Sequence, residues 1–102
     1  MNNRGKILWV DDEIQHLKPH ILFLKEKGYE MFKANNGQDA ISLAKSNIFD
    51  LVLLDQSMPG MDGLETLAEL KKIRQNQIII MITKTEDEWL MDEAINLSLI
   101  HI

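Results

Sequence analysis

Three short runs of only apolar residues limit the possible folds more than any other feature of the chain. They are Ile7–Val10, Leu51–Leu54 and Ile78–Ile82, with β-branched residues frequent in the first and the last. Such runs are typical of strands buried on both faces of a parallel sheet. A fourth segment, Tyr29–Ala34, mixes charged with apolar residues. We expect it to form a partly exposed edge strand at one side of the sheet.

Helical periodicity separates these predicted strands. The apolar stripes are Ile14, Leu17, Ile21 and Leu24 in one segment, and Leu64, Leu67, Ala68 and Leu70 in another. Pro19 is tolerated only in a first turn, so the first helix is expected to begin later than its apolar pattern suggests. Gly28 fits the C-cap of that helix, and Asn36-Gly37 fits the start of the next. Strands alternating with helices predict a doubly wound parallel α/β sheet.

Composition excludes several classes of function. Eleven basic and sixteen acidic residues give a net charge of −5, so direct binding to nucleic acid or anionic lipid has no electrostatic basis. The absence of cysteine excludes disulfides and thiol chemistry. No apolar run is long enough to span a bilayer, and the polar N-terminus lacks the pattern of a signal peptide. We therefore expect one cytoplasmic domain with no nucleic-acid or membrane partner.

Acidic and hydroxyl side chains follow the predicted strands. Asp11, Asp12 and Glu13 come after the first strand, Asp55 ends the third, and Thr83 ends the fourth. Sites in such sheets lie beyond the carboxyl ends of the strands, so these side chains are expected at one rim. Carboxylates held close together repel one another unless a cation neutralises them. Oxygen ligands without a nearby His or Cys favour Mg²⁺ over zinc.

A carboxylate beside such a metal is placed for nucleophilic attack on phosphorus. Asp55 is the predicted nucleophile and would form an acyl phosphate while the metal offsets the charge. The Thr83 hydroxyl would donate a hydrogen bond to a phosphoryl oxygen. Taken singly, Asp11 and Asp12 are also compatible with helix capping, and Asp55 with a turn. Their predicted convergence from several strand ends favours the functional interpretation.

Two segments resemble the receiver domains of two-component response regulators. They are KILWVDDE, residues 6–13, and FDLVLLDQSMPGMDG, residues 49–63, and the similarity extends to about Asn96. The resemblance implies the flavodoxin-like and CheY-like sheet with strand order 2-1-3-4. It implies a signalling domain that accepts a phosphoryl group, rather than an enzyme.

The resemblance also assigns roles to single residues. It implies that Asp55 accepts the phosphoryl group, and that Asp12 and Asp55 bind Mg²⁺ directly together with the backbone carbonyl of Ser57. Asp11 would act on the metal largely through water. Thr83 would be the switch hydroxyl that moves on phosphorylation and alters the surface of the fourth strand and fourth helix. The phosphodonor would be a sensor histidine kinase or a histidine phosphotransfer protein.

The C-terminal part departs from the family pattern. Receivers continue into a fifth strand ending in Lys-Pro and then a fifth helix, whereas this sequence stops at Ile102. We expect residues 1–96 to be an incomplete receiver, with an output domain beyond the truncation. Residues 97–102 are similar to the translation of a transposase adaptor end, which predicts a non-native tail. Lys84 stands where the family usually has a small residue, so it either obstructs the phosphoryl pocket or adds a cation.

Three other interpretations fit parts of the pattern. A degenerate receiver would serve only as a protein-interaction module. A phosphohydrolase with an aspartyl nucleophile shares the strand-end Asp, but such enzymes usually carry a second Asp two residues on, where this chain has Ser57. A flavodoxin-like cofactor binder shares the fold, but no Gly-rich phosphate loop follows the first strand.

Overall fold

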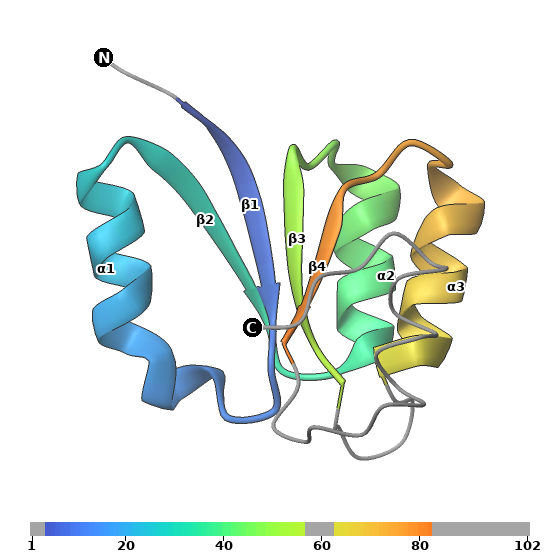
Figure 1. Ribbon diagram of the computed structural model, residues 1–102, viewed down its shortest axis with the longest axis horizontal. Coiled ribbons are helices and arrows are strands. Elements are labelled where there is room, and N and C mark those ends of the chain that lie inside the picture. Colours follow the sequence, from blue (N-terminus) through green and yellow to red (C-terminus); the bar gives the residue numbers. More distant parts are fainter. Residues whose placement is uncertain (1–3, 57–62, 83–102) are drawn as a thin grey trace.

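A computed structural model of the chain describes residues 4–56 and 63–82, which form a parallel sheet with helices on both faces (Figure 1). The strands are β1 (Gly5–Val10), β2 (Tyr29–Ala34), β3 (Leu51–Asp55) and β4 (Ile79–Ile82). They pair in the order β2-β1-β3-β4. This order confirms the predicted doubly wound fold, and it confirms that the mixed segment 29–34 is an edge strand.

Within residues 4–56 and 63–82, three α-helices connect the strands and cover the sheet. They are α1 (Lys18–Glu26), α2 (Gly37–Ser46) and α3 (Gly63–Ile73), and a short 3₁₀-helix, η1 (Ile14–Leu17), precedes α1. Helix α1 lies on one face, and α2 and α3 lie on the other (Figure 1). All strands run in the same direction, so their carboxyl ends meet at one edge of the sheet.

The boundaries of α1 follow from its proline and its glycine. The chain forms the 3₁₀ turn first, and Pro19 then occupies the first turn of α1, where its missing N–H removes no helical hydrogen bond. At the other end, Gly28 has a φ of 102° and follows the C-cap residue Lys27. Its N–H donates to the Lys25 carbonyl over 3.0 Å. The predicted late start and the predicted glycine stop are both confirmed.

Helix α2 begins at the predicted cap. The Asn36 side chain accepts a hydrogen bond of 2.8 Å from the Asp39 N–H, which satisfies one of the free donors of the first turn.

We expect Asn36→Ala to lower the free energy of unfolding by about 1 kcal/mol. Urea denaturation measures this loss. Gln38→Ala, at an exposed position of the same turn, is the control and should change stability by less than about 0.5 kcal/mol. Equal losses in both variants would contradict the capping role.

Two apolar layers hold the helices to the sheet. The larger layer lies between the sheet and helices α2 and α3, and its fully buried residues include Leu8, Val10, Ala40, Val52, Leu54 and Leu67. The smaller layer lies under α1 and is built on Ile7, Trp9, Ile21 and Leu53. Successive residues of β1 and β3 contribute to opposite layers, which explains why both strands are apolar throughout.

Two details differ from the predicted pattern. Ala68 is exposed, whereas Thr66 is fully buried, because the inward face of α3 follows the spacing Gly63, Thr66, Leu67, Leu70. Ile78 is 62% exposed and precedes β4, although its carbonyl still accepts a hydrogen bond from the Val52 N–H. An unbroken apolar run marks a strand, but it does not reveal where sheet pairing begins.

Several predicted features lie outside the described residues. These are Ser57, Thr83, Lys84, the fourth helix and the tail 97–102.

Among the residues that the structure describes, no helix is both long enough and apolar enough to cross a membrane.

Candidate functional site

Three carboxylates meet at the edge where the strands end. Asp11 and Asp12 follow β1 directly, and Asp55 is the last residue of β3. One oxygen atom from each lies within 4.8 Å of the others. The register explains this proximity: Val10 pairs with Leu54, so the residues that follow each of them emerge side by side. The predicted convergence is therefore observed for these three residues.

The backbone under these side chains belongs to the sheet. The Asp11 N–H donates to the Ala34 carbonyl over 3.0 Å, which extends the pairing of β1 with β2. Asp55 pairs with Ile82, and the next residue, Gln56, donates its N–H to the Ile82 carbonyl over 3.1 Å. A site built on strands that are paired in this way is positioned more accurately than one built on a free loop.

The carboxylates differ in exposure and in local bonding. Asp55 is 1% exposed and Asp11 is 5% exposed, whereas Asp12 is half-buried. The Oδ1 of Asp11 accepts a hydrogen bond of 2.8 Å from the Glu13 N–H, two residues further along the chain. A carboxylate has two acceptor oxygens. Asp11 therefore stabilises the turn after β1 and also contributes to the acidic cluster.

The cluster carries enough negative charge to favour a cation. At an effective dielectric constant of about 20, two unit charges this close repel by roughly 3 kcal/mol. A bound divalent cation reverses the sign of this contribution. All donors of the cluster are carboxylate oxygens, with neither His nor Cys in the group. These residues fit a hard cation such as Mg²⁺ and do not fit a zinc site.

Gly63 lies at the same edge of the sheet. It is the first residue of α3, and its N–H donates to the Gln56 carbonyl over 2.8 Å. The only sequence signal for this contact is that a glycine, Gly63, begins a helix soon after the strand that ends in Asp55.

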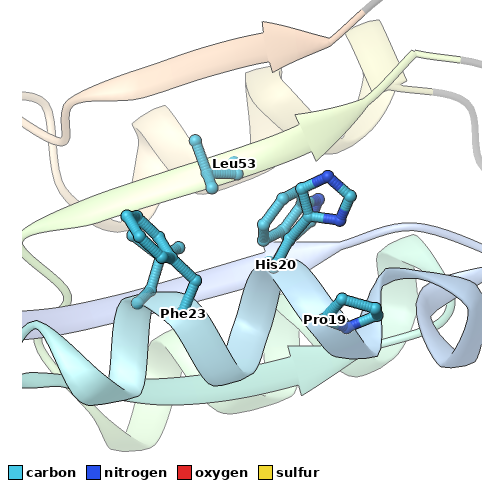
Figure 2. A pocket seen from close by; sticks show the side chains of 6 residues that line it. Pro19, His20, Phe23 and Leu53 are labelled. Carbon is cyan, nitrogen blue, oxygen red and sulfur yellow. The ribbon is translucent and has the colours of Figure 1, made fainter.

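An apolar pocket lies under α1 and is separate from the acidic cluster. Figure 2 shows Pro19, His20 and Phe23 of α1 facing Leu53 of β3 across it, and Trp9 and Leu24 complete the lining. Its volume is about 320 Å³. None of the three carboxylates lines this pocket.

The family model described as response regulator receiver domain matches residues 7–101. The chain belongs to the response regulator receiver domain family. The match covers nearly all of the chain, and receiver domains are signalling domains. It therefore favours signalling over the flavin-binding and phosphohydrolase alternatives.

Curated proteins support the same assignment of a receiver domain. The transcriptional regulatory protein ResD of Bacillus subtilis (strain 168) is 35% identical over 85 residues, which is 83% of this chain and 35% of ResD. The transcriptional regulatory protein SrrA of Staphylococcus aureus (strain NCTC 8325 / PS 47) is 35% identical over 83 residues, which is 81% of this chain and 34% of SrrA. The chain thus spans about a third of the length of these relatives.

Solved receiver structures share the fold. The response regulator TrrA from Thermotoga maritima, in complex with Mg²⁺-BeF, superposes with a TM-score of 0.80 at 33% identity, covering 99% of this chain and 84% of TrrA. A chain of the CheX-CheY-BeF3-Mg²⁺ complex from Borrelia burgdorferi gives a TM-score of 0.86 at 27% identity, covering 95% of this chain and 75% of that chain.

Proposed function

We propose that this receiver domain accepts a phosphoryl group on Asp55 in a reaction that requires Mg²⁺. The observation that carries the proposal is the convergence of Asp55 with Asp11 and Asp12 at adjacent strand ends. The phosphodonor is a phosphohistidine on a sensor histidine kinase or a histidine phosphotransfer protein. The output is a domain of the longer protein, as the names of the regulators ResD and SrrA suggest.

The oxygen atoms of the cluster would hold the metal. Asp12 and Asp55 would bind Mg²⁺ directly with the Ser57 carbonyl, and Asp11 would act through water. When bound, the cation offsets negative charge on the carboxylates and on the transferred phosphoryl group. The TrrA complex with Mg²⁺-BeF supports the choice of Mg²⁺, because that relative was solved with this cation together with a beryllium fluoride group.

The transfer is a displacement at phosphorus. A carboxylate oxygen of Asp55 attacks the phosphorus, the P–N bond to histidine breaks as the O–P bond forms, and the imidazole leaves with the electron pair of that bond. Asp55 contributes the nucleophile, and the paired strand beneath it fixes the direction of attack.

The phosphorylated state is then transmitted by a change between two packings. Thr83 donates a hydrogen bond to a phosphoryl oxygen, and residues 83–96 carry the altered surface. A domain that bound partners without accepting phosphate would be an interaction module instead. Labelling distinguishes the two functions.

Labelling with a small phosphodonor tests the proposal directly. We expect incubation with acetyl phosphate and Mg²⁺ to add one phosphoryl group, detected by intact-protein mass spectrometry. A chelator should prevent the labelling, and hydroxylamine should remove the label, because it cleaves acyl phosphates. An absence of labelling, or a label that survives hydroxylamine, would contradict an aspartyl phosphate.

The cluster also predicts a loss of metal affinity when one charge is removed. We expect Asp12→Asn to weaken Mg²⁺ binding by about 10- to 100-fold, since one charged ligand becomes neutral. Isothermal titration calorimetry measures the change. Glu26→Gln removes the same charge at an exposed position of α1 and should leave the affinity within about twofold. Equal losses of Mg²⁺ affinity in the two variants would show that binding depends only on the net charge of the chain.

A further inference from the structure

We infer that Gly63 is a positioning residue for Asp55. Its missing side chain allows the start of α3 to lie against the end of β3, and this contact sets the location of the Asp55 carboxylate. The inference rests on the proposed function, because it concerns how the phosphoacceptor is held. It assigns to Gly63 a role that turn formation does not explain.

The contact leaves no room for a methyl group. A Cβ added to Gly63 would lie 2.5 Å from the Gln56 Cα, 2.7 Å from the Asp55 carbonyl oxygen and 3.1 Å from the Gln56 carbonyl oxygen. Ordinary contacts of this kind begin at 3.4 Å. All three atoms belong to the backbone, so no flexible side chain can turn aside to accommodate the methyl group.

Neither side of the contact is free to move away. The helix is held by Thr66, Leu67 and Leu70, whose side chains are at most 2% exposed. The strand end is held by the hydrogen bond from the Gln56 N–H to the Ile82 carbonyl. Close-packed interiors transmit such a strain instead of absorbing it. A methyl group at position 63 therefore displaces the peptide that carries Asp55, or the start of α3, by roughly 1 Å.

A displacement of this size matters for the proposed chemistry. Mg²⁺ requires nearly ideal octahedral geometry with short bonds to its oxygen ligands. A misplacement of about 1 Å can reduce the rate of an oriented reaction by about 100-fold. A methyl group at position 63 is therefore expected to alter both the position and the chemistry of Asp55.

The test is Gly63→Ala in the full chain. We expect Mg²⁺ affinity, measured by calorimetry, to fall by about tenfold or more, and the rate of labelling by acetyl phosphate at saturating Mg²⁺ to fall by a similar factor. The circular dichroism spectrum should remain that of the unaltered chain. Leu64→Ala is the matched control, because it removes packing from the same first turn without adding an atom at the strand end. It should lower the melting temperature but leave Mg²⁺ affinity and labelling rate unchanged.

A measurement without metal separates this inference from the proposed function. The amide resonances of Asp55 and Gln56 in metal-free protein should shift in Gly63→Ala and stay in place in Leu64→Ala. If these resonances stay in place in both variants, the inference is wrong even where Mg²⁺ binds. If they shift but the unaltered chain neither binds Mg²⁺ nor becomes labelled, the positioning role stands and the proposed function fails.

A second measurement covers the case in which Gly63→Ala does not fold. In the unaltered chain, the Gly63 amide donates to the Gln56 carbonyl, so its resonance should respond to Mg²⁺ with the same midpoint as that of Asp55. A Gly63 resonance that does not move while Asp55 titrates would overturn the inference.

Discussion

Asp55→Asn is expected to abolish phosphoryl transfer and to leave the fold intact. The amide has nearly the shape of the carboxylate, so the 1% exposed position is filled as before. The asparagine amide is not a nucleophile towards phosphorus, so labelling by acetyl phosphate and Mg²⁺ should drop to background. The substitution also removes one charge from a cluster whose members repel one another, so it should not unfold the protein.

Intact-protein mass spectrometry measures the labelling, and urea denaturation measures the stability. Asp50→Asn is the matched control, because Asp50 is exposed and precedes the same strand, at the end opposite Asp55. It should be labelled at the rate of the unaltered chain. Labelling of Asp55→Asn at the normal rate would show that another residue accepts the phosphate, and the proposed function would then be wrong.

Leu8→Ala is expected to cause the largest loss of stability among the substitutions considered. Leu8 lies on β1, an interior strand of the sheet, and its side chain is fully buried in the layer beneath α2 and α3. The truncation removes buried apolar surface and leaves a cavity, which together cost about 3 kcal/mol. A single domain with a total stability of roughly 5–15 kcal/mol loses a large part of it.

Denaturation in urea, followed by circular dichroism, measures this loss. Leu22→Ala is the control for the same change on the surface, because Leu22 is 49% exposed on α1. It should alter the free energy of unfolding by less than about 0.5 kcal/mol. A similar loss in both variants would mean that the apolar layer beneath α2 and α3 does not dominate stability.

Local signals predicted the strands and helix ends well. The segment 29–34 was recognised as an edge strand because its charged residues are excluded from a position buried on both faces. Pro19 and Asn36 marked helix starts for different reasons. The Asn36 side chain accepts a hydrogen bond from a free N–H of the first turn, whereas Pro19 has no N–H that needs an acceptor there. These effects depend on a few neighbouring residues, so they can be read directly from the chain.

Features that depend on contacts between distant segments were predicted less well. Ala68 was placed on the buried stripe of α3, but the helix turns it outward and buries Thr66 instead. An apolar stripe several residues wide leaves the rotation of a helix undetermined, and packing against the sheet selects it. The start of β4 was also misjudged, since its pairing with β3 begins at Ile79 and not at Ile78.

The sequence by itself determined the class of fold and the residues of the acidic cluster. Strand-length apolar runs followed by Asp11, Asp12 and Asp55 lead to one edge of a parallel sheet, because parallel strands end on the same side. Only the tertiary structure decided how closely these carboxylates approach and that Gly63 lies against the backbone beneath Asp55. In a strand, the alternation of side chains specifies which face each one occupies, whereas the distances between atoms of neighbouring elements depend on strand register and on the close packing of α3 against β3.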